Sequence, residues 1–266
     1  MSRIDERFAS LRAADEGALV CFVTAGDPDT ETTEQIVLEL EKAGADIVEL
    51  GIPFSDPIAD GPSIQASGMR SLAHGTNIPA VLGLVKSIRR QSEIPLVLMT
   101  YYNPVLHYGL HRFAEDTVAA GVDGVILTDL TPEESDEWKS AADRAGVSTI
   151  FLLAPTSTPA RIAKVAKLAS GFVYCVSRIG VTGARLELAS GIRELVSAIR
   201  GMSEKPIAVG FGISTPEHVR EVCGYADGAV VGSALVDLIA EKAGSQGMLC
   251  EVHDFVQALK SGTEKP

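Results

Sequence analysis

The chain has 266 residues, of which 46% are hydrophobic and 22% are charged, and its formal net charge is -12. The length is close to the roughly 250 residues of an eight-stranded α/β barrel. The acidic balance, with no Lys/Arg-rich tract, argues against a nucleic-acid partner. No apolar run approaches the ~18 residues of a membrane span, and the charged N-terminus lacks the apolar stretch of a signal peptide, so we expect a cytoplasmic protein with no membrane contact.

Eight short β-prone segments alternate with helical stretches along the chain. Parallel strands that are covered on both faces show such continuous apolar runs. The predicted strands are residues 19–24, 46–51, 95–101, 124–129, 148–154, 171–177, 206–212 and 228–233. The predicted helices include residues 30–44 and 131–146, a short N-terminal helix over about 3–12 that covers the bottom, and a C-terminal helix over about 247–260 that packs outside.

The joints between these elements repeat. Thr-Pro-Glu occurs at Thr131 and Thr215, where it supplies a capping oxygen, a first-turn proline and a carboxylate that suits the helix dipole. Three helix-to-strand joints, near residues 42, 119 and 143, place a glycine just past a helix end. One recurring βα unit favours a (β/α)8 TIM barrel over a doubly wound open sheet, which stays the alternative. Since no low-complexity linker divides the chain, we predict a single domain over residues 1–266.

Glu49 is the first candidate for catalysis. It lies near the end of the second predicted strand and shares side-chain parity with Ile47 and Gly51. Active sites of barrels form at the C-terminal ends of strands, and burial raises a carboxyl pKa into the range of a general acid or base. The alternative is a buried glutamate satisfied by neighbouring hydroxyls or amides. Because burying a carboxylate for structure alone is costly, the sequence favours the functional interpretation.

A long loop over residues 51–63 follows this strand and offers a second carboxylate. It holds three prolines and exceeds the usual two to six residues of a βα loop, which indicates function. Asp56 and Asp60 lie in it, and alone either would be a turn or capping carboxylate. Paired with Glu49, one of them becomes a plausible second charge in the site.

Two glycine-rich turns predict a phosphate site. They follow the seventh and eighth strands, over residues 210–215 and 232–236. Glycine lets the backbone approach a ligand closely, and a helix that begins after Ser233 points amide groups and a positive dipole end at the site. Phosphate pockets of barrels often use these two loops. The alternative is that the glycines only permit tight packing.

Two kinds of catalytic chemistry are excluded because the predicted site lacks the residues that they need. No lysine lies at the C-terminal end of a predicted strand, so a Schiff-base aldolase lacks its nucleophile. The four cysteines show no metal-binding spacing, and only His107 among the histidines lies in a top loop, so we expect no metal site. Acid/base chemistry on a phosphorylated substrate remains.

The motifs FVTAGDPD (22–29), DIVELGIPFSDPIADGPSIQ (46–65), SRIGVTG (177–183), VGFGIS (209–214) and VVGSALV (230–236) resemble the tryptophan synthase α subunit family over essentially the whole chain. The resemblance implies cleavage of indole-3-glycerol phosphate to indole and glyceraldehyde 3-phosphate. It implies that Glu49 is the catalytic acid/base, that Asp60 holds the indole N–H, and that Tyr174 lies beside the scissile bond.

The same resemblance assigns the rest of the site. Thr182 belongs to a loop that closes over the substrate and can position Glu49 or Asp60. The implied indole slot consists of Phe22, Ile64, Met99 and Ile126. The implied phosphate site consists of Gly183, Gly212 and Ser233, with Gly210 and Gly232 adjacent.

The family also implies a partner, a β subunit that carries pyridoxal phosphate and completes an α2β2 heterotetramer. This chain itself is expected to hold no cofactor. Asp56–Pro57 and Asn103–Pro104 lie at family positions that contact that subunit. Two competing interpretations are a sugar-phosphate epimerase or isomerase, which leaves the Asp60 loop unexplained, and a non-catalytic activator, against which the presence of both Glu49 and Asp60 argues.

Overall fold

The computed structural model describes residues 2–176, 185–210 and 212–264. Its strands are all parallel and form one sheet with the neighbour order β5-β4-β3-β2-β1-β9-β8-β7-β6. Every predicted strand segment contains an observed strand. The strands are β1 (Ala18–Thr24), β2 (Ile47–Gly51), β3 (Leu96–Thr100), β4 (Gly124–Leu127), β5 (Ser148–Ile150), β6 (Leu152–Leu153), β7 (Val173–Val176), β8 (Ile207–Gly210) and β9 (Gly228–Val231).

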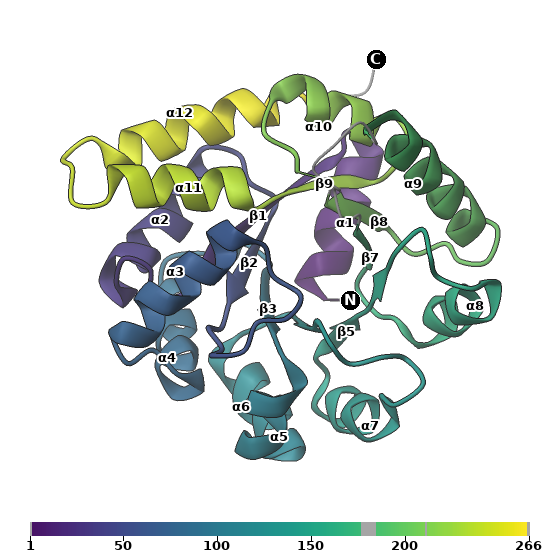
Figure 1. Cartoon of the computed structure of the whole chain (residues 1–266), viewed down its shortest axis with the longest axis horizontal. Coiled ribbons are helices and arrows are strands. Elements are labelled where there is room, and N and C mark those ends of the chain that lie inside the picture. The colour runs from purple at the N-terminus through teal and green to yellow at the C-terminus, as the bar shows by residue number, and fades with distance from the viewer. Residues whose placement is uncertain (1, 177–184, 211, 265–266) are drawn as a thin grey trace.

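The fifth predicted strand closes this sheet into a ring. β5 pairs with β4 and β6 pairs with β7, and only Phe151 separates β5 from β6. The carbonyl of Phe151 accepts a hydrogen bond from the amide of Tyr174 at 3.1 Å. The segment over residues 148–153 therefore pairs with β4 through its first half and with β7 through its second half, and in this way joins the two ends of the sheet (Figure 1). The predicted TIM barrel is confirmed, and an open doubly wound sheet is excluded.

Helices surround the ring on its outside (Figure 1). Their apolar faces pack against outward-facing strand residues such as Leu19, Val48 and Leu98 in one continuous outer core. The predicted C-terminal helix is confirmed, since α12 lies against α2, α10 and α11. The outer helices are α2 (Thr30–Lys42), α3 (Pro62–Ala73), α4 (Ile78–Ile88), α5 (Tyr102–Tyr108), α6 (Leu110–Ala120), α7 (Asp136–Ala145), α8 (Pro159–Leu168), α9 (Arg185–Arg200), α10 (Pro216–Cys223), α11 (Ser233–Lys242) and α12 (Met248–Lys260).

One helix, α1 (Arg3–Ala13), closes the N-terminal end of the ring, as predicted. Its buried residues Ile4, Phe8 and Leu11 pack with inward-facing strand residues such as Ile47 and Val97. Seen along the view of Figure 1, α1 lies across the inside of the ring. This plug leaves the C-terminal ends of the strands as the open end of the barrel.

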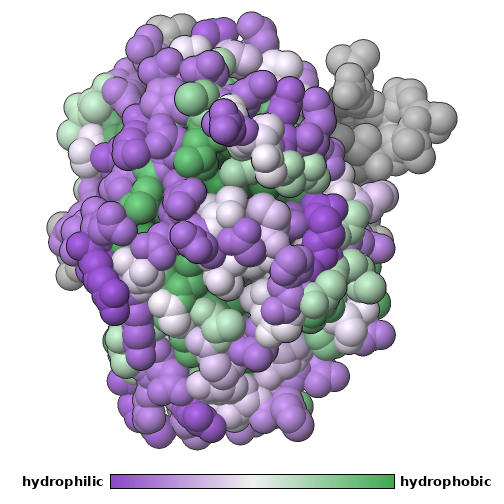
Figure 2. Space-filling model, turned by 90° about the vertical axis from the view of Figure 1, so that its left-hand side faces the viewer, coloured by the Kyte–Doolittle hydropathy of each residue, from purple (hydrophilic) through white to green (hydrophobic). Residues whose placement is uncertain are grey.

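The surface is mixed in character. Figure 2 shows the side formed by α2, α3, α4, α11 and α12, where polar residues dominate and apolar residues appear in small separate groups. None of the described helices combines the length and hydropathy that crossing a membrane requires.

The helix starts and ends follow the sequence with one exception. Thr215 caps α10 by accepting from the amide of His218, and Gly121 and Gly146 end α6 and α7 with positive φ. The prediction that a helix starts at Thr131 is wrong, because α7 begins at Asp136. The hydroxyl of Thr131 donates to the Glu134 carboxylate at 3.1 Å instead of capping a helix, and residues 132–134 form a turn.

Three aspartates fix the N-terminal end of the barrel. Asp46, Asp123 and Asp227 each precede a strand, and each accepts a hydrogen bond from the first amide groups of a neighbouring strand and pairs with a basic side chain. These carboxylates lie far from the open end, so they hold the strand register and take no part in the site. The amides are those of Leu19 at 2.6 Å, Leu96 at 2.9 Å and Ile207 at 2.7 Å.

Candidate active site

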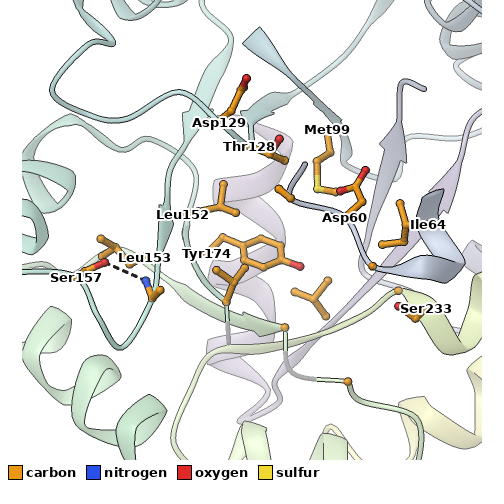
Figure 3. Close-up of a pocket in the computed structure, with 18 of the residues that line it drawn as sticks. Asp60, Ile64, Met99, Thr128, Asp129, Leu152, Leu153, Ser157, Tyr174 and Ser233 are labelled. Atoms are coloured by element: carbon orange, nitrogen blue, oxygen red, sulfur yellow. Dashed lines mark hydrogen bonds between the residues drawn. The ribbon is translucent and has the colours of Figure 1, made fainter. Parts of the chain in front are cut away.

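A cavity of about 660 Å³ opens at the C-terminal ends of the strands, a size typical of small-molecule sites. The βα loops surround it, as the barrel fold leads one to expect. Figure 3 shows Tyr174 at its centre, with Asp60, Met99 and Ile64 on one side and Leu152 and Leu153 on the other. A smaller cavity adjoins it beneath the loop over residues 52–61, and Asp60, Ile64, Met99 and Thr128 line both.

Glu49 lies inside the barrel, below this cavity. On β2 it is the register partner of Phe22 and Val97, and it lies one layer below Gly51, which lines the smaller cavity. Its side chain is fully buried, and within the described part of the chain neither carboxyl oxygen has a hydrogen-bond partner. Burial raises the pKa of Glu49 to about 8. The carboxyl is therefore mostly protonated at neutral pH and can donate a proton.

Tyr174 connects Glu49 with the cavity. It extends from β7, lines the cavity and is close enough to Glu49 that the glutamate charge adds to the effect of burial in raising the tyrosine pKa well above its usual value. A β-carbon on Gly210 would lie 2.7 Å from the Tyr174 hydroxyl oxygen. Gly210 is thus required for the tyrosine ring to occupy this place.

Asp60 is partly buried at the end of the loop over residues 52–61 and lines both cavities. Burial raises its pKa, while a hydrogen bond with the Tyr101 hydroxyl acts in the opposite direction. In Figure 3 its carboxyl lies beside Met99 and faces the cavity. The two carboxyls therefore differ in environment, since in the part of the chain that the structure describes Glu49 has no hydrogen-bond partner, whereas Asp60 has one that favours its ionised form.

The residues of the implied indole slot lie in two layers. Ile64 and Met99 line the main cavity, and Phe22 lines the smaller one. Ile126, the register partner of Met99, is fully buried in the inner core and does not line either cavity. Leu152, which the sequence did not single out, lines the main cavity opposite Met99.

The implied phosphate end is formed by two backbone turns. Gly212 has a φ of +56°, and Gly232 is the N-cap of α11, which begins at Ser233 itself, one residue earlier than predicted. Within the described residues no side chain caps α11, and the first amide groups to bond inside the helix are those of Leu235 and Val236, which donate to the Gly232 carbonyl. The two residues before them, Ser233 and Ala234, line the cavity at the positive end of the helix dipole, where backbone amides can bind an anion. Gly212 and Gly232 line the cavity as well, whereas Thr182 and Gly183 lie outside the described residues.

Two polar residues at strand ends were missed. Tyr101 follows β3 and contacts Asp60, and Thr128 follows β4 and lines both cavities. Their position in the sequence could have identified them, since both lie at the end of a predicted strand, where the active sites of barrels form. Among residues 2–176, 185–210 and 212–264, no group of three or more His, Cys, Asp or Glu side chains is placed to hold a metal ion.

Comparison with known proteins gives one consistent family. Residues 8–264 match the family model described as tryptophan synthase alpha chain. The chain is 57% identical to the tryptophan synthase alpha chain of Geotalea uraniireducens, covering 99% of this chain and 98% of the relative. It is 54% identical to that of Geobacter sulfurreducens, covering 98% of each chain. Tryptophan synthase subunit alpha from Legionella pneumophila superposes with a TM-score of 0.91 at 37% identity, covering 98% of each chain.

Proposed function

This chain belongs to the tryptophan synthase alpha chain family, and from that premise we propose how its residues perform the α reaction. The chain is a lyase of tryptophan biosynthesis that cleaves indole-3-glycerol phosphate to indole and glyceraldehyde 3-phosphate. The observation that most strongly supports the roles assigned to these residues is the environment of Glu49. Glu49 is a fully buried carboxyl that has no hydrogen-bond partner among the described residues, next to a cavity that is lined by Asp60 and by the glycine turns at Gly212 and Gly232.

The reaction needs one proton delivered and one removed. Protonated Glu49 donates to C3 of the indole ring, which turns the ring into a cationic electron acceptor. Removal of the proton from the adjacent side-chain hydroxyl by the resulting carboxylate then forms the aldehyde. The carbon–carbon bond breaks as its electron pair returns to the ring and releases neutral indole. Glu49 ends protonated again, so the cycle balances.

Asp60 stabilises the intermediate. Ionised, it accepts the hydrogen bond of the ring N–H and offsets the positive charge that develops there, a preorganised electrostatic contribution. The apolar slot around Ile64 and Met99 holds the ring, and the turns at Gly212 and Ser233 hold the phosphate. Because Glu49 lies one layer below Gly51, its side chain must turn toward the cavity for the transfer to C3.

The partner in this proposal is a β subunit that contains pyridoxal phosphate and joins this chain in an α2β2 heterotetramer in the cytoplasm. Indole is small and apolar, so direct transfer to the partner prevents its loss. The proposed contact lies at Asp56–Pro57 and Asn103–Pro104, next to a groove of about 420 Å³. Two large apolar side chains near these positions, Ile58 and Leu106, are 77% and 53% exposed.

The reaction is tested by indole release from indole-3-glycerol phosphate by the isolated chain. We expect Asp60→Asn to lower kcat roughly 10²–10³-fold, as removal of a transition-state contact does elsewhere. Asp254→Asn, an exposed aspartate on α12, is the matched control and should behave as wild type. An Asp60→Asn variant with wild-type turnover would refute the role of Asp60.

The partner is tested by repeating the assay with a cognate β subunit and measuring complex formation by sedimentation. We expect a complex at micromolar concentration and faster cleavage, because docking on the loop over residues 52–61 selects its ordered state. Unchanged turnover within a formed complex contradicts the coupling, and no complex contradicts the interface itself.

A further inference from the structure

Tyr101 lies where the barrel meets the loop that carries Asp60. It directly follows β3, is the N-cap residue of α5, and only 3% of its surface is exposed. Its ring packs on Phe54 of the loop with 5.3 Å between the ring centroids. A tyrosine buried in this way needs hydrogen-bond partners for its hydroxyl. Two of them, Ala59 and Asp60, come from the loop, and a third is the side chain of Thr128 after β4.

The hydroxyl of Tyr101 joins two successive loop residues. It accepts a hydrogen bond from the amide of Ala59 at 2.9 Å and donates to the carboxylate of Asp60. A phenol has one proton to donate and lone pairs to accept, so both contacts can exist at the same time. Burial raises the pKa of Tyr101 to about 12, which keeps this donor protonated throughout the physiological range.

Among the described residues, one other side chain bonds to Asp60, since the side-chain amide of Gln65 donates to the Asp60 carbonyl at 2.9 Å, a contact that does not involve the carboxylate. The internal hydrogen bonds of the loop are short-range turns, from Ile58 N–H to the Asp56 carbonyl and from Asp60 N–H to the Pro57 carbonyl. Such turns shape the loop locally but do not attach it to the barrel. The Tyr101 hydroxyl is a side-chain contact from a strand end to the part of the loop that enters the cavity.

We propose that Tyr101 is a positioning residue for the α reaction, whose hydroxyl fixes the Asp60 carboxylate at the cavity wall and favours its ionised form. The inference rests on the role proposed above for Asp60. Tyr101 itself need not touch the substrate. Its effect should appear in kcat more than in KM, because the charge that Asp60 stabilises develops on the ring only during cleavage.

The test is Tyr101→Phe, which keeps the ring contact with Phe54 and removes only the hydroxyl. We expect kcat for indole-3-glycerol phosphate cleavage to fall roughly 10- to 100-fold, with KM within a few-fold, the range for one hydrogen bond to a charged group. Without the hydroxyl the pKa of Asp60 rises, so the acid limb of the kcat–pH profile should move to higher pH. The alkaline limb, which belongs to Glu49, should stay in place.

Tyr102→Phe is the matched control. Its hydroxyl lies near Glu134 and Glu137 and away from Asp60, so the variant should cleave as wild type. Unchanged kcat in Tyr101→Phe overturns the inference. A lower kcat with an unmoved acid limb also overturns it, because that result indicates a structural role alone. If Asp60→Asn is inactive while Tyr101→Phe is normal, only this inference fails, whereas an active Asp60→Asn removes the proposed function of Asp60 as well.

Discussion

Glu49→Gln should make the protein more stable while it removes activity. The folded state raises the carboxyl pKa from 4.5 to about 8 because the side chain is fully buried. Between these two values the folded chain holds a proton that the unfolded chain has lost, so wild-type stability falls as pH rises. Because of the raised pKa of Glu49, the free energy of unfolding of the wild type is lower by about 3 kcal/mol at pH 7, and by less than about 1 kcal/mol at pH 5, than if the carboxyl stayed protonated in both states. Glutamine does not titrate, so the variant does not lose this stability as the pH rises.

The assay is urea unfolding at pH 5, 6, 7 and 8, followed by the fluorescence of Trp138. This residue is the single tryptophan of the chain, is fully buried and packs on Phe113, so it reports loss of the folded core. The free energy of unfolding of Glu49→Gln should exceed that of wild type by an amount that grows with pH. Glu204→Gln, an exposed glutamate, controls for the change in net charge. A difference that stays constant from pH 5 to pH 8 would show that Glu49 does not titrate with a raised pKa.

Three further outcomes are expected. Gly212→Val should weaken binding of glycerol 3-phosphate at least about 10-fold in calorimetry, because the valine side chain enters the anion site. The control is Gly244→Val, which also places valine at positive φ but away from the cavity, and it should bind normally. Equal weakening in both variants would point to backbone strain. Gly210→Ala should lower kcat, since its β-carbon would lie 2.7 Å from the Tyr174 hydroxyl oxygen, and wild-type kcat would contradict this placement. Asp46→Asn should cost about 1–3 kcal/mol in urea unfolding and leave kcat unchanged, whereas a loss of kcat without destabilisation would assign Asp46 to the site.

The barrel was predictable because its signals are local. Each predicted strand is an apolar run, and Gly121 and Gly146 end their helices as the sequence indicates. The start of α7 was not, because Thr131 has the right residue type for a cap but bonds to Glu134. The ring-closing role of Phe151 depends on two neighbouring strands, which local sequence does not specify.

The candidate site was predictable in its residue types and less so in its depth. Strand parity places Glu49 inside the barrel, but only the packed structure shows that it lies below the cavity and that no described residue bonds to its carboxyl oxygens. Ile126 likewise has the right parity, but it is fully buried in the inner core and lines neither cavity. The Tyr101–Asp60 contact joins residues 41 positions apart, and no local pattern encodes such a pair.

The central claim is that the buried Glu49 carboxyl supplies the proton that starts cleavage. The most direct test is the single-turnover rate of indole release from indole-3-glycerol phosphate, measured from pH 6 to pH 9 for wild type and Glu49→Gln. We expect the wild-type rate to fall above pH about 8, as the carboxyl ionises, and the variant to be slower at pH 7 by at least roughly 10²–10⁴-fold while it still binds glycerol 3-phosphate. A Glu49→Gln variant that releases indole within a few-fold of the wild-type rate would contradict the claim.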